Sequence, residues 1–223
     1  GNGFVGTHAA QQLVLRGAKV RCISRSGTMP VHLQKEDWAQ AVEWQAGDAG
    51  HAEPEWFDDA RAVVTLVGSP PLPTFSRSAY AHQLMMNSKP NCQAIEAARI
   101  AGVKKLVLMG AAIPRPLQTE RFAYYAGKQR SQAAAEAFAQ ASPAHSAWVL
   151  QPSNMYGTRH SAGGLPIPLA PLMAPLAKIL PAYFVAVNKV AACICDAILG
   201  DNAAANGLRV ISQQQLQSYK ADF

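Results

Sequence analysis

The sequence predicts an α/β fold with a doubly wound parallel sheet, followed by a small C-terminal portion. Three observations predict this class. A continuous apolar run, typical of a strand that is buried on both faces of a parallel sheet, occurs at residues 62–67, and the next strand is expected at residues 104–109. Segments with helical character separate such strands, as in β-α-β units. The chain opens with a glycine-rich turn that leads directly into a helix.

The first elements follow from glycine positions and apolar spacing. Apolar residues after Gly6 recur at helical intervals as far as Arg16, and Gly17 is suited to end that helix. Residues 19–24 alternate as a strand does, and residues 42–46 form another short strand. We therefore expect a turn, a helix and two strands in the first fifth of the chain.

The later elements alternate in the same way. Pro90 lies inside one helical stretch, and we expect a break there because proline has no backbone N–H to donate. The expected elements are a strand at 62–67, a helix at 79–101, a strand at 104–109, a helix at 124–140 and a strand at 148–151.

Composition excludes several classes of protein. With 49% hydrophobic residues in 223, the chain is neither disordered nor collagen-like, and it has room for one large or two small domains. The net charge of +6 is spread along the chain, without a basic run, so we expect no nucleic-acid partner. Only 15% of the residues are charged, which favours a surface that faces a partner protein or a membrane.

Cysteine and histidine spacing indicates no metal site. The four cysteines form no C-x-x-C pair and the six histidines no H-x-x-x-H pair, so we expect buried free thiols in a reducing compartment. No Gly-x-Ser-x-Gly sequence marks a hydrolase nucleophile. The cysteines are Cys22, Cys92, Cys193 and Cys195.

Residues 163–187 carry one charge, Lys178, and five prolines. So many prolines, at about 3 kcal/mol each inside a helix, exclude a transmembrane span. Two interpretations remain open: an apolar lid or membrane-docking face, or ordinary packing of a short helix onto the core.

The opening turn satisfies G-x-G-x-x-G through Gly1, Gly3 and Gly6. The first glycine permits the tight turn, the second lets the backbone approach a pyrophosphate, and the third lets helix and strand pack closely. Partial positive charge at the helix start favours the same anion. The sequence therefore predicts a dinucleotide site, although the strand expected before such a turn is absent; we expect that strand, with a targeting segment, to precede Gly1.

The end of the second strand bears on which dinucleotide binds. No Asp or Glu occurs from Gly1 to Lys35, so the acidic residue that would hold the ribose 2′-hydroxyl of NAD is missing. Ser24, Arg25 and Ser26 occupy that place, and a guanidinium beside hydroxyls suits a 2′-phosphate. NADP(H) is favoured over NAD(H), unless Arg25 is merely a solvated loop residue.

Two further residues suit the adenosine half. Asp48 follows the third predicted strand and could accept a hydrogen bond from the adenine amino group, and Gly68 would let the ring lie against the fourth strand. Each could equally be a turn residue.

Tyr124 and Lys128 are the candidate catalytic residues. Their i, i+4 spacing places a phenol and an ammonium on one face of a helix. The nearby cation is expected to lower the pKa of the tyrosine, which would deliver a proton to a carbonyl, while Lys128 would also hold the nicotinamide ribose.

These motifs together resemble the short-chain dehydrogenase/reductase superfamily, in its extended and atypical branches. The resemblance covers nearly the whole chain and implies a Rossmann fold, with residues 1–157 as the dinucleotide-binding core and residues 158–223 as a short substrate or lid portion that is not independent. It also implies a set of further cofactor-binding residues: Phe4, Val5, Leu66, Val67, Asn87, Pro152 and Asn154.

The likeness extends to members associated with ubiquinone biosynthesis, through the opening motif, the Ser24 to Gly27 stretch and Trp38 to Trp44. A more distant likeness is to the nucleotide-binding accessory subunit of respiratory complex I. These resemblances imply an organelle, a mitochondrion or a plastid, and a position peripheral to its inner membrane.

The chain departs from the family at one catalytic position. A serine is expected after the strand at 104–109, but Ala111 and Ala112 stand there, and Thr119 is the nearest candidate substitute. Such a donor can be worth about 10²–10³ in rate.

Three functions follow from these observations. The first is an NADP(H)-dependent oxidoreductase acting on an apolar, quinone-related carbonyl or hydroxyl, with Phe75, Tyr156 and residues 165–180 on the apolar side of its pocket. The second is a non-catalytic nucleotide-binding accessory subunit of a membrane protein complex. The third, by fold alone, is a sugar-nucleotide epimerase.

Overall fold

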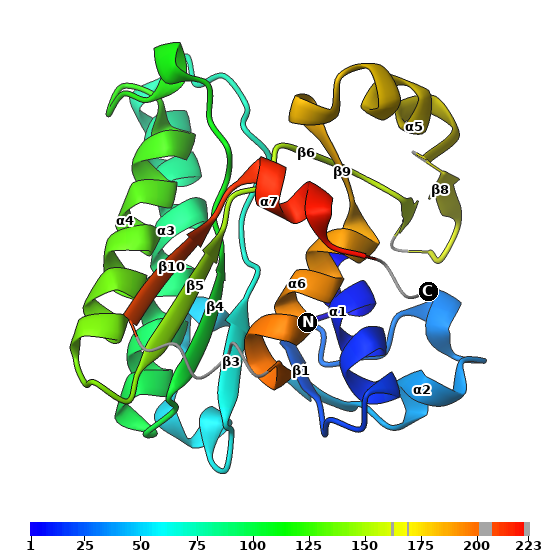
Figure 1. The fold of residues 1–223 in the computed structure, drawn as a ribbon. Coiled ribbons are helices and arrows are strands. Elements are labelled where there is room, and N and C mark those ends of the chain that lie inside the picture. The colour runs from blue at the N-terminus through cyan, green and yellow to red at the C-terminus, as the bar shows by residue number, and fades with distance from the viewer. Residues whose placement is uncertain (162, 169, 201–206, 221–223) are drawn as a thin grey trace. The chain divides into compact units, whose positions relative to one another are not determined.

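A computed structural model describes residues 1–161, 163–168, 170–200 and 207–220, and the chain in it divides into two units (Figure 1). Unit 1 consists of Gly1–Asp48, Pro152–Asp196 and Ser212–Phe223, and unit 2 of Ala49–Gln151 and Ala197–Ile211. Both contain parallel strands with helices packed beside them, which confirms the predicted α/β fold.

Unit 2 is built on a four-stranded parallel sheet in the order β10-β5-β4-β3. Val63 pairs with Leu106, and Leu106 with Ala147, across neighbouring strands. The elements of this unit are η2 (Ala49–His51), η3 (Pro54–Phe57), β3 (Ala62–Thr65), α3 (Arg77–Ile100), β4 (Lys105–Met109), η4 (Arg115–Leu117), α4 (Ala123–Gln140), β5 (Ser146–Leu150) and β10 (Gly207–Ile211).

The core of unit 2 lies between the sheet and helices α3 and α4, which cover one of its faces (Figure 1). Ile95 of α3 and Phe138 of α4 are buried against Leu106 and Val149 of the strands. Alternate strand residues face the other side, where Val107 and Trp148 are also buried. Strands buried on both faces explain the continuous apolar runs in the sequence.

The predicted break at Pro90 is wrong. Helix α3 runs through Pro90, which is buried, from Arg77 to Ile100. Close packing against α4 holds the helix together at this point, since a Cβ on Gly127 would lie 2.9 Å from the carbonyl oxygen of Leu84. The Oγ of Ser131 also donates to the carbonyl oxygen of Asn87, at 2.8 Å. These tertiary contacts outweigh the proline penalty of about 3 kcal/mol.

Unit 1 contains two parallel strand pairs, β1-β2 and β6-β9, and the antiparallel hairpin β7-β8. Its elements are α1 (Phe4–Leu15), β1 (Arg21–Ser24), η1 (Val31–Leu33), α2 (Asp37–Gln40), β2 (Glu43–Ala46), β6 (Asn154–Tyr156), β7 (Thr158–His160), β8 (Pro166–Pro168), α5 (Ala170–Ile179), η5 (Pro181–Tyr183), β9 (Phe184–Ala186), the larger part of α6 (Val187–Leu199) and α7 (Gln213–Ser218).

The opening turn and its helix pack on the first strand pair. Ala10 of α1, Cys22 of β1 and Val42 share one buried cluster, with Trp38 and Trp44 partly buried beside it. Gly17 takes a positive φ of 81° directly after the helix, as expected for a glycine that ends it. Cys22, Cys193 and Cys195 are buried free thiols, as predicted, whereas Cys92 is partly exposed.

Among the described residues, no helix combines the length and the apolar character needed to cross a membrane.

Candidate functional site

The glycine-rich turn is held by the packing of two of its three glycines. The backbone nitrogen of Gly1 donates to the carbonyl oxygen of Ile23 at 2.5 Å. A Cβ on Gly6 would lie 2.2 Å from the oxygen of Gly1, and one on Gly1 would lie 2.5 Å from the Cβ of Cys22. A Cβ on Gly3 would meet no described atom within 4 Å. The turn therefore keeps open space at its middle glycine only.

Helix α1 begins at this turn without a side-chain cap. Gly3 is its N-cap residue and has no side chain to accept from the first backbone N–H groups. Phe4, Val5 and Gly6 form the first turn, and the earliest bond of the helix runs from the nitrogen of Thr7 to the oxygen of Gly3. Uncapped N–H groups at a helix start suit an anionic ligand.

A tight turn at the end of β1 lies beside the glycine-rich turn. Asn2 donates from Nδ2 to the Oγ of Ser26 at 3.1 Å, and the nitrogen of Gly27 donates to the oxygen of Ser24 at 3.1 Å. Gly27 has a φ of +65°, and a Cβ there would lie 2.6 Å from the nitrogen of Ala46. Glycine is required at this position, which fixes Ser24 and Ser26 next to the opening motif.

Arg25 and Asp48 flank this turn on the surface. Arg25 is exposed and makes no hydrogen bond or ion pair with any residue that the structure describes. Asp48 is also exposed, and it follows Gly47, whose nitrogen donates to the oxygen of Ser24 at 2.9 Å. Unit 1 thus brings both predicted residues to the carboxyl end of the strand pair β1-β2.

The stretch from Pro152 to Gly157 supplies the last candidates in unit 1. Pro152 is buried, and Asn154 donates from Nδ2 to the oxygen of Tyr183 at 3.1 Å, which ties β6 to the segment before β9. A Cβ on Gly157 would lie 3.4 Å from the ring of Phe4, so this stretch approaches the start of α1. The amide of Asn154 serves a structural bond here.

Lys128 is the centre of the candidate site in unit 2. Its side chain is buried, and Nζ donates to the carbonyl oxygen of Met109, at the end of β4, over 2.8 Å. A Cβ on Gly68 would lie 3.3 Å from Nζ and 2.9 Å from the Oδ1 of Asn87. Gly68 of the loop after β3, Asn87 of α3 and Lys128 of α4 therefore meet at the carboxyl ends of β3 and β4.

Tyr124 lies next to Lys128 on α4, but the ammonium does not lower the pKa of the tyrosine as predicted. Nζ is 5.8 Å from the centroid of the Tyr124 ring, over its face. Burial raises the pKa of Tyr124 to about 12 and lowers the pKa of Lys128 to about 8. The expectation that the ammonium lowers the tyrosine pKa is wrong for this structure, because desolvation of both groups dominates.

Both the oxygen and the nitrogen of the Asn87 side-chain amide have hydrogen-bond partners. Its Oδ1 accepts from the nitrogen of Ser69 at 3.1 Å, and its Nδ2 donates to the Oγ of Ser69 at 2.8 Å and to the oxygen of Gln83 at 2.9 Å. These bonds fix the loop after β3, including Gly68, against α3.

The structure adds a buried amide that the sequence analysis missed. Asn91 has no exposed surface, and its Nδ2 donates to the oxygen of Val67 at 3.0 Å. Thr65 donates to its Oδ1 at 2.5 Å, and Ser131 of α4 lies 3.4 Å from its Nδ2. Asn91 thus joins β3, α3 and α4. Its spacing of four residues from Asn87, on the same helix face, was the available signal.

Leu66 and Val67 lie in the segment that these bonds hold, and both are partly buried. Ala111 and Ala112 follow β4, where the nitrogen of Gly110 donates to the oxygen of Leu150 at 2.8 Å. Thr119 is exposed in the loop before α4, and its Oγ1 accepts from the nitrogen of Arg121 at 3.3 Å. The predicted site residues therefore form two sets, one in each unit.

Comparisons with known proteins point to one family. A model of the NAD dependent epimerase/dehydratase family matches residues 1–173. An uncharacterised chloroplastic protein of Arabidopsis thaliana is 30% identical over 183 residues, which is 80% of this chain. The chain spans about half (56%) of that relative's length.

Solved structures share the fold at low sequence identity. MoeE5, in complex with UDP-glucose and NAD, has a TM-score of 0.67 at 19% identity, covering 95% of this chain and 73% of its own. A UDP-N-acetylglucosamine 4-epimerase from Methanobrevibacter ruminantium has a TM-score of 0.69 at 16% identity, covering 95% and 74%. The UDP-Glc/GlcNAc 4-epimerase of Campylobacter jejuni has a TM-score of 0.65 at 18% identity, covering 96% and 79%.

Proposed function

Because this chain belongs to the NAD dependent epimerase/dehydratase family, we propose that it binds a nicotinamide dinucleotide, NADP(H) in preference to NAD(H), and uses it to reduce or oxidise an apolar substrate. The observation that carries the proposal is the opening turn. Gly1 and Gly6 are fixed by their own packing, whereas Gly3 leaves open space at an uncapped helix start. That space suits a pyrophosphate.

The preference for NADP(H) rests on the turn after β1. Asn2 holds Ser26 beside the glycine motif, and Arg25 next to it is exposed and has no described partner that would compete with a ligand. A guanidinium there would hold a 2′-phosphate by charge-assisted hydrogen bonds. Some solved structures that share the fold are complexes with NAD. The affinity for NADP(H) is therefore to be compared with the affinity for NAD(H).

Tyr124 and Lys128 are the proposed catalytic residues. When bound, the reduced dinucleotide supplies a hydride. A tyrosine whose pKa is about 12 stays protonated at neutral pH, so Tyr124 can donate its proton to a carbonyl oxygen as the hydride arrives. Lys128, with a pKa of about 8, is mostly an ammonium at neutral pH and can donate to ribose hydroxyls.

The proposed substrate is an apolar, quinone-related carbonyl or hydroxyl. The stretch of residues 165–180, which has no acidic side chain and only one cation, Lys178, supports this class of substrate. A nucleotide sugar, as in the solved epimerases, would instead need polar and arginine contacts to its diphosphate. We also propose an organellar setting, which the chloroplastic relative supports.

A second candidate is a non-catalytic accessory subunit that binds the nucleotide for structural reasons. Ala111 and Ala112 favour it, because neither supplies the hydroxyl donor expected beside the substrate oxygen. Retention of Tyr124 and Lys128 favours catalysis.

The two candidates are separated by one set of assays on purified protein. NADPH oxidation is followed with a short-chain benzoquinone and, separately, NADP⁺ reduction is tested with UDP-glucose. For the oxidoreductase, Tyr124→Phe abolishes turnover with the quinone, whereas Tyr125→Phe, at the adjacent position of α4, keeps it. Tight nucleotide binding without turnover of either substrate would establish the accessory function instead.

A further inference from the structure

An unusual number of large apolar side chains is exposed at one end of unit 1. They lie directly before β8, on β8, on α5 and directly after α5, in the segment that Figure 1 draws in olive and gold. Leu165 and Ile179 have exposed fractions of 71% and 75%, so packing onto the core does not account for them. We call this set the apolar face: Leu165, Ile167, Leu176, Ile179, Leu180 and Tyr183.

Helix α5 presents its apolar residues outward. Leu176, Ile179 and Leu180 stand at i, i+3 and i+4, which places them on one side of the helix, and all three are exposed. The nitrogen of Leu180 donates to the oxygen of Leu176 at 2.7 Å, so the helical geometry extends through Leu180. Ala177, off this side, is buried. Leu176, Ile179 and Leu180 therefore face away from the rest of unit 1.

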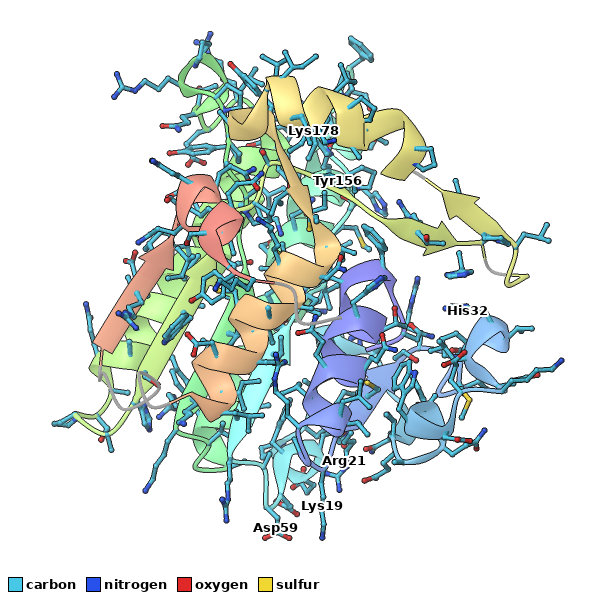
Figure 2. All side chains as sticks on the ribbon, turned by 45° about the vertical axis from the view of Figure 1, so that its right-hand side comes forward. Lys19, Arg21, His32, Asp59, Tyr156 and Lys178 are labelled. Carbon is cyan, nitrogen blue, oxygen red and sulfur yellow. The ribbon has the colours of Figure 1, made fainter. Side chains whose placement is uncertain are left out.

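The charged side chains in the segment that carries the apolar face are all cationic. No Asp or Glu occurs in residues 137–195. Lys178 of α5, labelled in Figure 2, is exposed. Arg159 of β7 pairs with Ile167 of β8 in the hairpin, and it is exposed as well. This segment therefore has two exposed cations, Arg159 and Lys178, and no acidic residue.

We propose that the apolar face docks onto the surface of an anionic lipid bilayer. Apolar side chains that enter the headgroup boundary, with cations beside them, are the combination such a surface binds. Lysine is depleted in protein–protein interfaces, so the exposed Lys178 favours a lipid surface over a protein partner. Helix α5 has ten residues, so it would lie in the interface without spanning it. This inference does not depend on the proposed dinucleotide chemistry.

Co-sedimentation with vesicles tests the proposal. The protein should bind vesicles of phosphatidylcholine with phosphatidylglycerol and bind pure phosphatidylcholine much less, with binding reduced by high salt. Ile179→Ser should weaken the partition coefficient about tenfold or more. Lys178→Gln should weaken it about fivefold.

Matched controls come from unit 2. Ile100, at the end of α3, has an exposed fraction of 60%, and Lys104 is exposed, so Ile100→Ser and Lys104→Gln should leave vesicle binding unchanged. Equal losses in the control variants would overturn the proposal, as would the absence of binding to anionic vesicles. A concentration-dependent dimer that Ile179→Ser dissociates, without any vesicle binding, would assign the apolar face to a second copy of the chain. NADPH affinity measured on the same variants keeps this outcome separate from failure of the proposed function.

Discussion

The Nζ of Lys128 donates to the carbonyl oxygen of Met109 over 2.8 Å, with the ring of Tyr124 beside it, and no carboxylate of a described residue pairs with it. Burial lowers the pKa of this lysine to about 8 because the ammonium has lost most of its hydration. A ligand that offers hydroxyl acceptors would relieve that loss. The lysine is therefore held in a state that favours binding of a polar group.

Lys128 makes stability depend on pH. Below pH 8 both states are protonated and the folded state bears a penalty of roughly 3 kcal/mol. Between pH 8 and the unfolded pKa of 10.5, the unfolded state holds more protons, so stability rises with pH. Denaturant midpoints at pH 7, 8 and 9 should increase in the wild type and stay flatter in Lys128→Met.

The high pKa of Tyr124 sets the highest pH at which these denaturant midpoints can be compared. Its folded pKa of about 12 exceeds the ordinary value of 10.0, so the unfolded state loses its proton first and stability falls above pH 10. The comparison is therefore made below pH 10. If the denaturant midpoints of the wild type and of Lys128→Met change with pH in the same way, burial of the ammonium does not make stability depend on pH.

Gly3→Ala and Gly6→Ala should separate ligand binding from folding. A Cβ on Gly6 would lie 2.2 Å from the oxygen of Gly1, so Gly6→Ala should lower the melting temperature clearly. Gly3 has open space, and its replacement should change stability by less than about 1 kcal/mol. We expect Gly3→Ala to weaken NADPH binding about tenfold or more, that is, by about 1.4 kcal/mol. Unchanged affinity in a folded Gly3→Ala protein would place the pyrophosphate elsewhere.

Asn91→Leu should destabilise the fold strongly. It leaves the hydroxyl of Thr65 and the oxygen of Val67 without their partner in a buried site. Unpaired buried groups cost about 1–3 kcal/mol each, so we expect a loss of about 3 kcal/mol in the free energy of unfolding. Gln93→Ala, exposed on the same helix, is the control and should change it by less than about 0.5 kcal/mol.

Two stacked histidines should make unit 1 sensitive to acid. The rings of His32 (labelled in Figure 2) and His160 lie 3.6 Å apart and nearly parallel. Burial lowers the pKa of His32, and so do the nearby His160 and His8, while Glu36 opposes them. Because the folded pKa lies below 6.5, the unfolded state binds more protons as pH falls, and stability decreases.

His160→Gln should therefore flatten the fall in melting temperature between pH 7 and pH 5. His82→Gln, on an exposed turn of α3 in the other unit, should not. Identical profiles for the wild type and His160→Gln would contradict a role for the stacked pair.

The sequence predicted the element types well because the strands are short, apolar and bounded by glycine or proline. Helix α1, strand β4 and helix α4 lie within a few residues of their expected positions. The continuous helix through Pro90 could not be foreseen, since it depends on contacts with Ser131 and Gly127 far along the chain. At Pro90, tertiary packing outweighs the low helix propensity of proline.

The candidate site was only partly predictable. Glycine spacing indicated the opening turn, and i, i+4 spacing indicated the Tyr124 and Lys128 pair. Burial, however, reversed the expected direction of the tyrosine pKa shift. Desolvation depends on what packs around a group, which spacing along a helix does not reveal. Asn91 escaped notice because polar residues in a helix are ordinarily exposed. The boundary expected at residue 157 and the roles of the site residues stay predictions.

The most direct test of the account is the affinity of the purified protein for NADPH and for NADH, by calorimetric titration, in the wild type and in Arg25→Gln. We predict that the wild type binds NADPH more tightly than NADH. Arg25→Gln should lose about 1.5–3 kcal/mol of NADPH binding free energy and leave NADH binding nearly unchanged. If the protein binds neither dinucleotide, or if Arg25→Gln leaves the NADPH affinity unchanged, the proposed preference for NADP(H) is contradicted.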